Sequence, residues 1–471
     1  MTSLVDLTVR EASALLAAGE VSAEQLLNAT LEQIRENEPR FHAYATLMED
    51  SARRHARRAD QELRDGAPRS SLHGVPIGVK DLCYTHDAPT EGGSRVLKGF
   101  APTYDATVVR RLRDAGAVIV GKTVTHEFAY VQDEPETRNP WISDGFPGGS
   151  SAGSGVALAT RTAFGTIGTD TAGSIRVPAA LNGVTGLKPT YGRVSRYGVI
   201  PMAETLDTVG PMARTADDCG LMLDVICGPD RADPSALAEI GMGDVRSVSG
   251  MRLGVDRDYF FGSFLRDDMR RCIEKALDDL RALGAELIDV RIPALDETAA
   301  IGLIILLAET SAGHRAYLRS PARERYVQAT RVMLELGELV SAPAYVNAQR
   351  VRRAIARHVQ AAFEDEGLDA LVGPTCHVTT IPMNSVRVDI SAGDDNTYLH
   401  LMSVANVLGL PALSVPCGLS DPGLPVGLQI IGRPLQESVL LSLGRAYQDR
   451  TDWHRHRPPL LGDQGDQQQV A

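Results

Sequence analysis

The sequence lacks features that mark several large classes of protein. Its six cysteines, at positions 83, 219, 227, 272, 376 and 417 of 471 residues, form no CxxC pair. This spacing argues against a zinc motif or a disulfide framework and predicts reduced thiols. Basic residues are outnumbered, 48 Lys and Arg against 60 Asp and Glu, and the net charge of −12 argues against nucleic-acid or anionic-membrane binding. No signal-peptide pattern opens the chain, and the most apolar run, 299–308, is too short to cross a bilayer, so we expect a cytoplasmic protein.

Hydrophobic residues make up 43% of the chain, which is enough for a sizeable core. A helix-like apolar pattern, a glycine and a short β-prone run follow one another three times, around Gly116, Gly284 and Gly367. Further strands are expected near 75–79, 413–415 and 426–431. This alternation predicts an α/β fold with helices layered on a mostly parallel or mixed sheet.

The first 65 residues read as helical. Thr8-x-x-Glu11 and Ser22-x-x-Gln25 have the spacing of capping boxes, and each predicts the start of a helix. Gly19 is expected to end the first of these helices. Residues 51–65 alternate Arg, Ala, Asp and Glu, which is typical of a solvated helix face.

The strongest functional signal is residues 148–189, GGSSAGSGVALATRTAFGTIGTDTAGSIRVPAALNGVTGLKP. Apolar residues interrupt the glycines and serines at fixed places, unlike in a flexible linker. The turn from Asp170 to Ser174 can aim several backbone N–H groups at one point, which makes a nest for negative charge. A hydroxyl beside such a nest is the minimum equipment for acyl transfer.

Two common motifs match in letters but not in context. Residues 116–123 satisfy the Walker A pattern, but strand formers fill the loop and a helix precedes it, which inverts the P-loop topology. Residues 149–153 fit GxSxG, which would make Ser151 a nucleophile. Asp369 and His377 follow in the order of an α/β-hydrolase triad, so an esterase of this type is an alternative. A loop precedes the motif where that fold has a hydrophobic strand, and this makes it the weaker reading.

Several stretches together form a more specific pattern: GVPIGVKDL, PGGSSAGSG, GTDTAGSIRVPAALNGVTGLKPTYGRVSRYGV, NVLGLPALSVPCG and LPVGLQIIGRP. From about residue 5 to about residue 450 the chain resembles the amidase signature family. The resemblance implies one large α/β/α domain over residues 66–455, with a mixed central sheet flanked by helices. It also implies a helical region packed on the core at 1–65 and a polar tail at 456–471.

The resemblance implies a Ser-Ser-Lys triad that needs no cofactor or metal. Its nucleophile maps onto Ser174, its bridging serine, held by a cis peptide in this family, onto Ser150, and its lysine onto Lys80. By itself, a lysine at the end of the strand 75–79 would be expected to extend to solvent. As a base it must be neutral, and lowering its pKa from about 10.4 to about 7–8 by burial costs on the order of 4 kcal/mol.

The family's oxyanion hole maps onto the nest, whose residues are Thr171, Ala172, Gly173 and Ser174. Alanine stands at 172 where many members have glycine, a departure that backbone donors tolerate. Supporting roles are expected for three further residues of the block, and bracing of the loop is favoured over substrate contact. These residues are Ser151, Asp170 and Arg176.

The motifs leave the amide open. We expect a stand-alone hydrolase for small aryl or alkyl amides, with side activity on carbamates (a urethanase) or esters, and with no nucleic-acid or membrane partner; the family favours a homodimer. A silent binding protein would lack a triad member, and none is missing. The alternative is the glutamine-hydrolysing A subunit of a tRNA-dependent amidotransferase, because GLKPTYGRVSRYG is very close to that branch.

Two features count against the amidotransferase. Leu399 stands near the point where that branch places an acidic residue for the glutamine ammonium, and residues 299–313 are apolar, unlike a docking surface for partner subunits. Arg352 resembles the arginine that grips the glutamine carboxylate, although a solvated helix residue would look the same.

Overall fold

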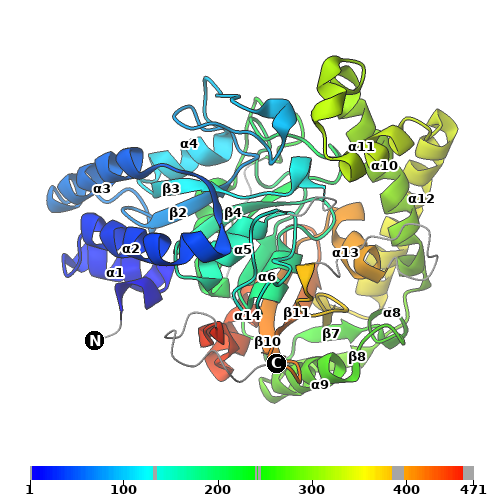
Figure 1. Cartoon of the computed structure of the whole chain (residues 1–471). Helices are drawn as coiled ribbons and strands as arrows, with labels where there is room; N and C mark the ends of the chain where they lie inside the picture. The colour runs from blue at the N-terminus through cyan, green and yellow to red at the C-terminus, as the bar shows by residue number, and fades with distance from the viewer. Residues whose placement is uncertain (1–2, 131–134, 239–240, 242–245, 384–396, 460–471) are drawn as a thin grey trace.

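A single mixed sheet runs through the part of the chain that the computed structural model describes, residues 3–130, 135–238, 241, 246–383 and 397–459 (Figure 1). Its strands are β1 (Tyr44–Leu47), β2 (Pro76–Lys80), β3 (Val118–Thr123), β4 (Gly165–Asp170), β5 (Thr185–Lys188), β6 (Thr208–Ala213), β7 (Arg252–Val255), β8 (Glu286–Asp289), β9 (Ala370–Pro374), β10 (Ala412–Leu419) and β11 (Pro425–Gly432). They lie in the order β1-β3-β2-β4-β6-β5-β10-β11-β9-β7-β8. The predicted α/β class with a mixed sheet is confirmed.

Helices cover both faces of the sheet. They are α1 (Val9–Ala18), α2 (Ala23–Phe41), α3 (Glu49–Arg64), α4 (Thr107–Asp114), α5 (Ala152–Ala159), α6 (Arg176–Asn182), α7 (Ala216–Ile226), α8 (Arg257–Phe260), α9 (Asp267–Ala282), α10 (Thr298–Leu318), α11 (Gln328–Gly337), α12 (Ala342–Asp365), α13 (Thr397–Val407) and α14 (Glu437–Arg450). In β4, a Cβ on Gly165 would meet Met222 of α7, whereas one on Gly168 would meet Ser151 at the start of α5. These glycines are three residues apart, so they face opposite sides, and α5 and α7 lie on opposite faces.

The three predicted helix–glycine–strand units are all present. Gly116 separates α4 from β3, Gly284 separates α9 from β8, and Gly367 separates α12 from β9. All three have a positive φ, of 83°, 94° and 59°, which lets the chain leave the helix in the left-handed conformation. Because residues 118–123 form a buried strand, the Walker A match is not a phosphate-binding loop.

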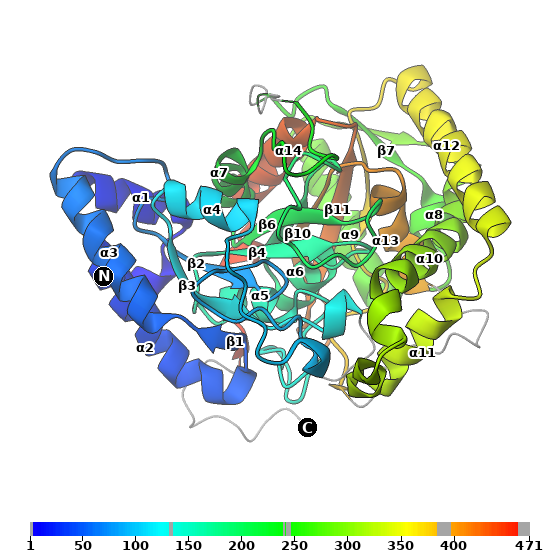
Figure 2. The same cartoon turned by 90° about the horizontal axis from the view of Figure 1, so that it is seen from above.

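The N-terminal helices follow their sequence signals. Both capping boxes form, at Thr8 and at Ser22, and Gly19 ends α1 with a φ of 70°. On α3 most arginines face solvent, as predicted, but its alanines are buried where the helix packs on β3. Figure 2 shows α1–α3 at one end of the molecule and α10–α12 at the other.

The parallel strands β2, β3 and β4 place the residues of the predicted site. β2 pairs in parallel with β3 on one side and with β4 on the other. Lys80 ends β2 and Asp170 ends β4, so both lie at the same edge of the sheet. The carboxyl ends of parallel strands are a frequent place for active sites in α/β folds.

The state of the cysteines and the lengths of the helices agree with what the composition predicts. All six cysteines are free thiols, and four of them are buried. Within the described residues, no helix has both the length and the apolar character of a membrane span.

Candidate active site

Lys80 lies entirely inside the protein. Its side chain has no exposed surface, so the expectation that it extends to solvent from the strand end is wrong. Its Nζ donates hydrogen bonds of 2.8 Å to Ser150 Oγ and 2.8 Å to Thr169 Oγ1. Burial lowers the pKa of Lys80 to about 7, although nearby acidic groups oppose the shift. Near neutral pH, a large fraction of Lys80 is therefore an uncharged amine.

The two serines assigned to the triad lie on neighbouring loops. Ser150 is fully buried just before α5, and its peptide bond with Gly149 is cis. Ser174 lies between β4 and α6, and its carbonyl accepts a hydrogen bond of 3.3 Å from the N–H of Ser151. Its own hydroxyl has no hydrogen-bond partner among the described residues. The structure thus joins Lys80 to Ser150 and leaves the hydroxyl of Ser174 available.

The nest begins where β4 ends. Gly173 has a φ of 100°, and a Cβ at this position would lie 2.6 Å from Cγ of Met402, so the turn requires glycine. The N–H of Gly173 donates to Asp170 Oδ1 at 2.7 Å. The N–H groups of the other three nest residues have no acceptor among the residues that the structure describes. Of the four donors predicted for the oxyanion hole, three therefore remain for a ligand.

Asp170 and Arg176 form an ion pair behind the nest. Arg176 Nε lies 3.0 Å from Asp170 Oδ2, and neither side chain has any exposed surface. Burial opposes ionisation of Asp170, but Arg176 outweighs it and holds the pKa of this carboxyl well below its usual range. The guanidinium also donates to Gln429 Oε1, Asn406 Oδ1 and the carbonyl of Met402. This is the geometry of a brace, which is the role expected for the pair.

Arg176→Met should destabilise the protein strongly. It leaves the buried Asp170 carboxylate without its counter-charge, and we expect the free energy of unfolding to fall by about 3–5 kcal/mol. Urea denaturation measures this loss. Arg271→Met is the control, because Arg271 pairs with Asp421 in a largely exposed position where water screens the pair, and its loss should change the stability far less. Equal losses in the two variants would contradict the bracing role.

Ser151 is better placed to support β4 than to attack a substrate. Its hydroxyl donates to the carbonyl of Thr169 at 3.2 Å and accepts from the N–H of the same residue at 3.3 Å. Asp369, the acid of the α/β-hydrolase alternative, instead accepts from the N–H of Arg252 at 2.9 Å and from Arg246 at 3.3 Å. The geometry therefore favours the supporting role of Ser151.

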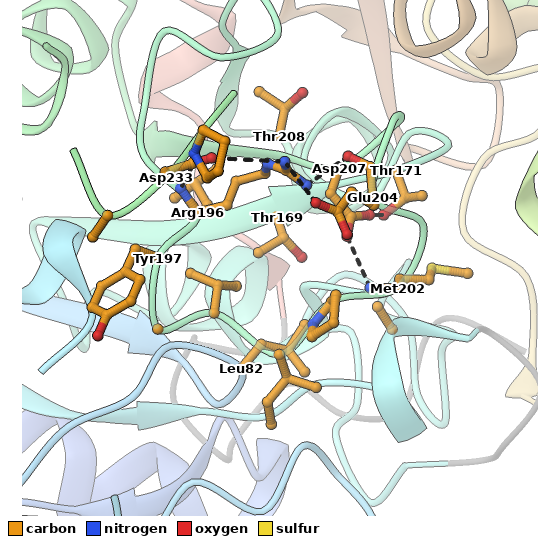
Figure 3. A pocket seen from close by; sticks show the side chains of 18 residues that line it. Leu82, Thr169, Thr171, Arg196, Tyr197, Met202, Glu204, Asp207, Thr208 and Asp233 are labelled. Atoms are coloured by element: carbon orange, nitrogen blue, oxygen red, sulfur yellow. Dashed lines mark hydrogen bonds and ion pairs between the residues drawn. The ribbon is translucent and has the colours of Figure 1, made fainter. Parts of the chain in front are cut away.

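A cavity of about 240 Å³ opens beside this edge of the sheet (Figure 3). Its wall includes Thr169, the second partner of Lys80, and Thr171, the first residue of the nest. The wall carries apolar side chains, among them Leu82, Val199, Ile200 and Met202, and it also carries the charged side chains of Arg196, Glu204, Asp207 and Asp233. Small apolar groups can therefore be accommodated next to the residues that surround Lys80.

Three residues at this site were not identified from the sequence. Thr169 contacts Lys80, and it could have been found by recognising 165–170 as a strand that carries it to the same edge. Asp207 contacts Thr171, and Asn406 contacts both members of the ion pair. These two come from distant parts of the chain, and no local pattern indicates them.

Comparisons with known proteins agree with one another. A family model described as "Amidase" matches residues 25–441. The A subunit of the glutamyl-tRNA(Gln) amidotransferase of Myxococcus xanthus is 40% identical over 97% of this chain and 100% of its own length. A protein of Pseudomonas putida named amidase is also 40% identical, over 98% of this chain and 100% of its own. The peptide amidase of Stenotrophomonas maltophilia has a similar structure, with a TM-score of 0.83 at 35% identity, covering 96% of this chain and 98% of its own.

Proposed function

The chain belongs to the amidase signature family and is an amide hydrolase, and from this premise we propose that it cleaves small aryl or alkyl amides as a stand-alone enzyme. The observation that carries the proposed mechanism is the buried Lys80, whose pKa lies at about 7 and whose amine contacts Ser150. A neutral amine in this position can accept a proton through the serine.

In the proposed mechanism Ser174 is the nucleophile. When substrate binds, its unpartnered hydroxyl turns to Ser150 and closes a contact that is open in this structure. Ser174 Oγ then forms a bond to the amide carbonyl carbon and gives its proton to Ser150 Oγ, which passes its own proton to Lys80 Nζ. The net result is that one proton moves from Ser174 through Ser150 to Lys80, and neither serine is left with a charge.

The nest stabilises the oxyanion that this attack creates. Each of the three unpartnered N–H groups can contribute about 3 kcal/mol to the transition state. Lys80 returns the proton through Ser150 to the amine nitrogen, the C–N bond breaks, and the acyl group remains on Ser174. Water, deprotonated by the same relay, then releases the carboxylic acid. Carbamates and esters can react by the same steps, because both carry a carbonyl with a leaving group.

The surroundings of Arg352 support a substrate other than glutamine. Its Nε donates to the carbonyl of Val407, and its two terminal nitrogens donate to the hydroxyl and the carbonyl of Thr205, each at 3.0 Å. The guanidinium is thus committed to protein acceptors, which weakens its case as a carboxylate grip. Leu399, half-buried on α13, offers no charge for an ammonium group. The apolar part of the cavity wall agrees with this preference.

A substrate panel tests the proposed specificity. We expect kcat/KM for an anilide or a short alkyl amide to exceed that for glutamine by at least about 100-fold, because Arg352 is committed to protein acceptors and Leu399 offers no charge for the ammonium group of a zwitterion. Ammonia or aniline release is measured for glutamine, anilides, carbamates and fatty amides, with Ser174→Ala protein as the background. A dominant glutaminase activity would instead favour the amidotransferase reading, in line with the name of the Myxococcus relative.

A further inference from the structure

Two antiparallel strands end side by side next to the nest. Asp170, the last residue of β4, pairs with Thr208, the first residue of β6. Thr171 and Asp207 are the next residues beyond this pair, one on each chain segment. Their side chains join, because Thr171 Oγ1 donates to Asp207 Oδ1 at 2.5 Å. The first residue of the nest is thus tied to a carboxylate whose place follows from the strand register.

Asp207 is itself firmly held. Its carboxylate accepts hydrogen bonds from the N–H groups of Met202, at 2.8 Å, and Ala203, at 3.1 Å. The same loop is anchored at Thr205, whose N–H and hydroxyl donate to Glu309 of α10 at 2.8 Å and 2.7 Å. The position of Thr171 is therefore set by a loop that the helical layer of α10 fixes from outside.

The charged groups around Lys80 differ in how far they are already neutralised. Asp170 is paired with Arg176. Asp81 is paired with Lys122 at 2.9 Å. Burial raises the pKa of the Cys83 thiol to about 11, which keeps it uncharged at neutral pH. Asp207 is different, because its partners are a hydroxyl and two backbone N–H groups.

Asp207 faces the cavity beside Thr169, which binds Lys80 (Figure 3). Arg196 reaches into the same cavity and lies 3.9 Å from carboxylates of both Glu204 and Asp233. Burial raises the pKa of Asp207, whereas its hydrogen bonds and Arg196 oppose this shift. Its carboxylate also contributes to the electrostatic environment of Lys80, where negative charge favours the ammonium form.

We propose that Asp207 is a positioning residue of the amide hydrolysis: it fixes the nest through Thr171, and its negative charge stabilises the protonated form of Lys80. The inference rests on the proposed function of Lys80 as the base. Asp207 touches neither substrate nor reacting atoms in this account. It acts on the oxyanion hole through one hydrogen bond and on the base through its field.

The pH dependence of kcat/KM for an anilide tests the inference. Wild-type activity rises with pH as Lys80 loses its proton, so the acid limb reports the base in the free enzyme. Asp207→Asn keeps the shape but removes the charge, which disfavours protonated Lys80. We expect the acid limb to move to lower pH by about 0.5 unit or more, and the plateau of kcat/KM to fall about tenfold.

Three variants separate charge from structure. Asp207→Glu keeps the charge and should keep the wild-type limb while lowering the plateau. Thr171→Val removes the hydroxyl and should lower the plateau without moving the limb. Glu286→Gln removes an exposed carboxylate from the edge strand β8, away from the cavity, and should change neither. Asp207→Ser replaces Asp207→Asn if circular dichroism shows that the asparagine variant does not fold.

Folded Asp207→Asn protein with an unmoved acid limb would overturn the inference, whatever its plateau. Ser174→Ala in the same assay keeps this result distinct from a failure of the proposed function. An active Ser174→Ala enzyme contradicts the mechanism itself. If the Ser174→Ala enzyme is inactive and the acid limb of Asp207→Asn is unmoved, the mechanism stands and only the proposed role of Asp207 is contradicted.

Discussion

Ser174→Ala should lower kcat/KM for a chromogenic anilide by at least about 10⁴-fold, the scale of losing a catalytic nucleophile. The expected loss is large because the hydroxyl of Ser174 lies in the nest and has no partner in the described structure, whereas the hydroxyls of Ser150 and Ser151 are hydrogen-bonded. Stability should change little, since the hydroxyl of Ser174 holds no hydrogen bond to a described residue. Aniline release measures the activity, and thermal unfolding measures the stability.

Ser151→Ala is the matched control for this experiment. Ser151 lies one residue from Ser150 and is also buried, but among the described residues its hydroxyl bonds only to the backbone of Thr169. We expect a loss in kcat/KM below about tenfold, together with a modest loss of stability, of about 1 kcal/mol. The reverse pattern, with an active Ser174→Ala and an inactive Ser151→Ala enzyme, would revive the α/β-hydrolase reading.

Lys80→Met should abolish turnover while leaving the protein folded. The variant removes the base, and we expect kcat/KM to fall by at least about 10³-fold. Its stability should equal or exceed that of the wild type, because burying a lysine costs charge stabilisation: a pKa of about 7 in place of 10.5 corresponds to about 5 kcal/mol. Methionine fills a similar volume without that cost. The measurements are anilide turnover and the urea midpoint.

Lys122→Met is the control, and for this variant we expect a loss of stability. Lys122 is as deeply buried as Lys80, but it forms an ion pair with Asp81. Its removal leaves the Asp81 carboxylate unpaired, and we expect a loss of about 3–5 kcal/mol in stability. If Lys80→Met unfolded the protein as Lys122→Met is expected to do, Lys80 would be a structural cation and not a base.

Local signals predicted much of the fold. The capping boxes at Thr8 and Ser22 formed, and the glycines after α4, α9 and α12 ended helices before strands, because each signal acts within a few residues. β4 was not predicted, since its sequence GTIGTD has neither strict alternation nor a continuous apolar run. Its place between β2 and β6 comes from burial on both faces.

Only part of the candidate site could be predicted from the sequence. The block around Ser150 and Ser174 and the motif with Lys80 carried the family resemblance. The local pattern alone misjudged Lys80, because its burial depends on neighbouring elements and not on β2. The contacts of Arg176 with Asn406 and Gln429 span 230 and 253 residues, so neither partner could be found by local pattern. Asp207 was missed for a related reason: its role follows from strand register, which emerges only in the folded sheet.

The proposed mechanism depends most on the protonation state of Lys80. A ¹³C NMR titration of lysine-labelled protein, with the Lys80 signal assigned by its absence in Lys80→Met, measures this state directly. We predict a titration midpoint near pH 7, where burial places the pKa of the amine. A midpoint near that of an exposed lysine, about 10.4, would contradict the mechanism, because Lys80 would then be an ammonium ion whenever the enzyme works.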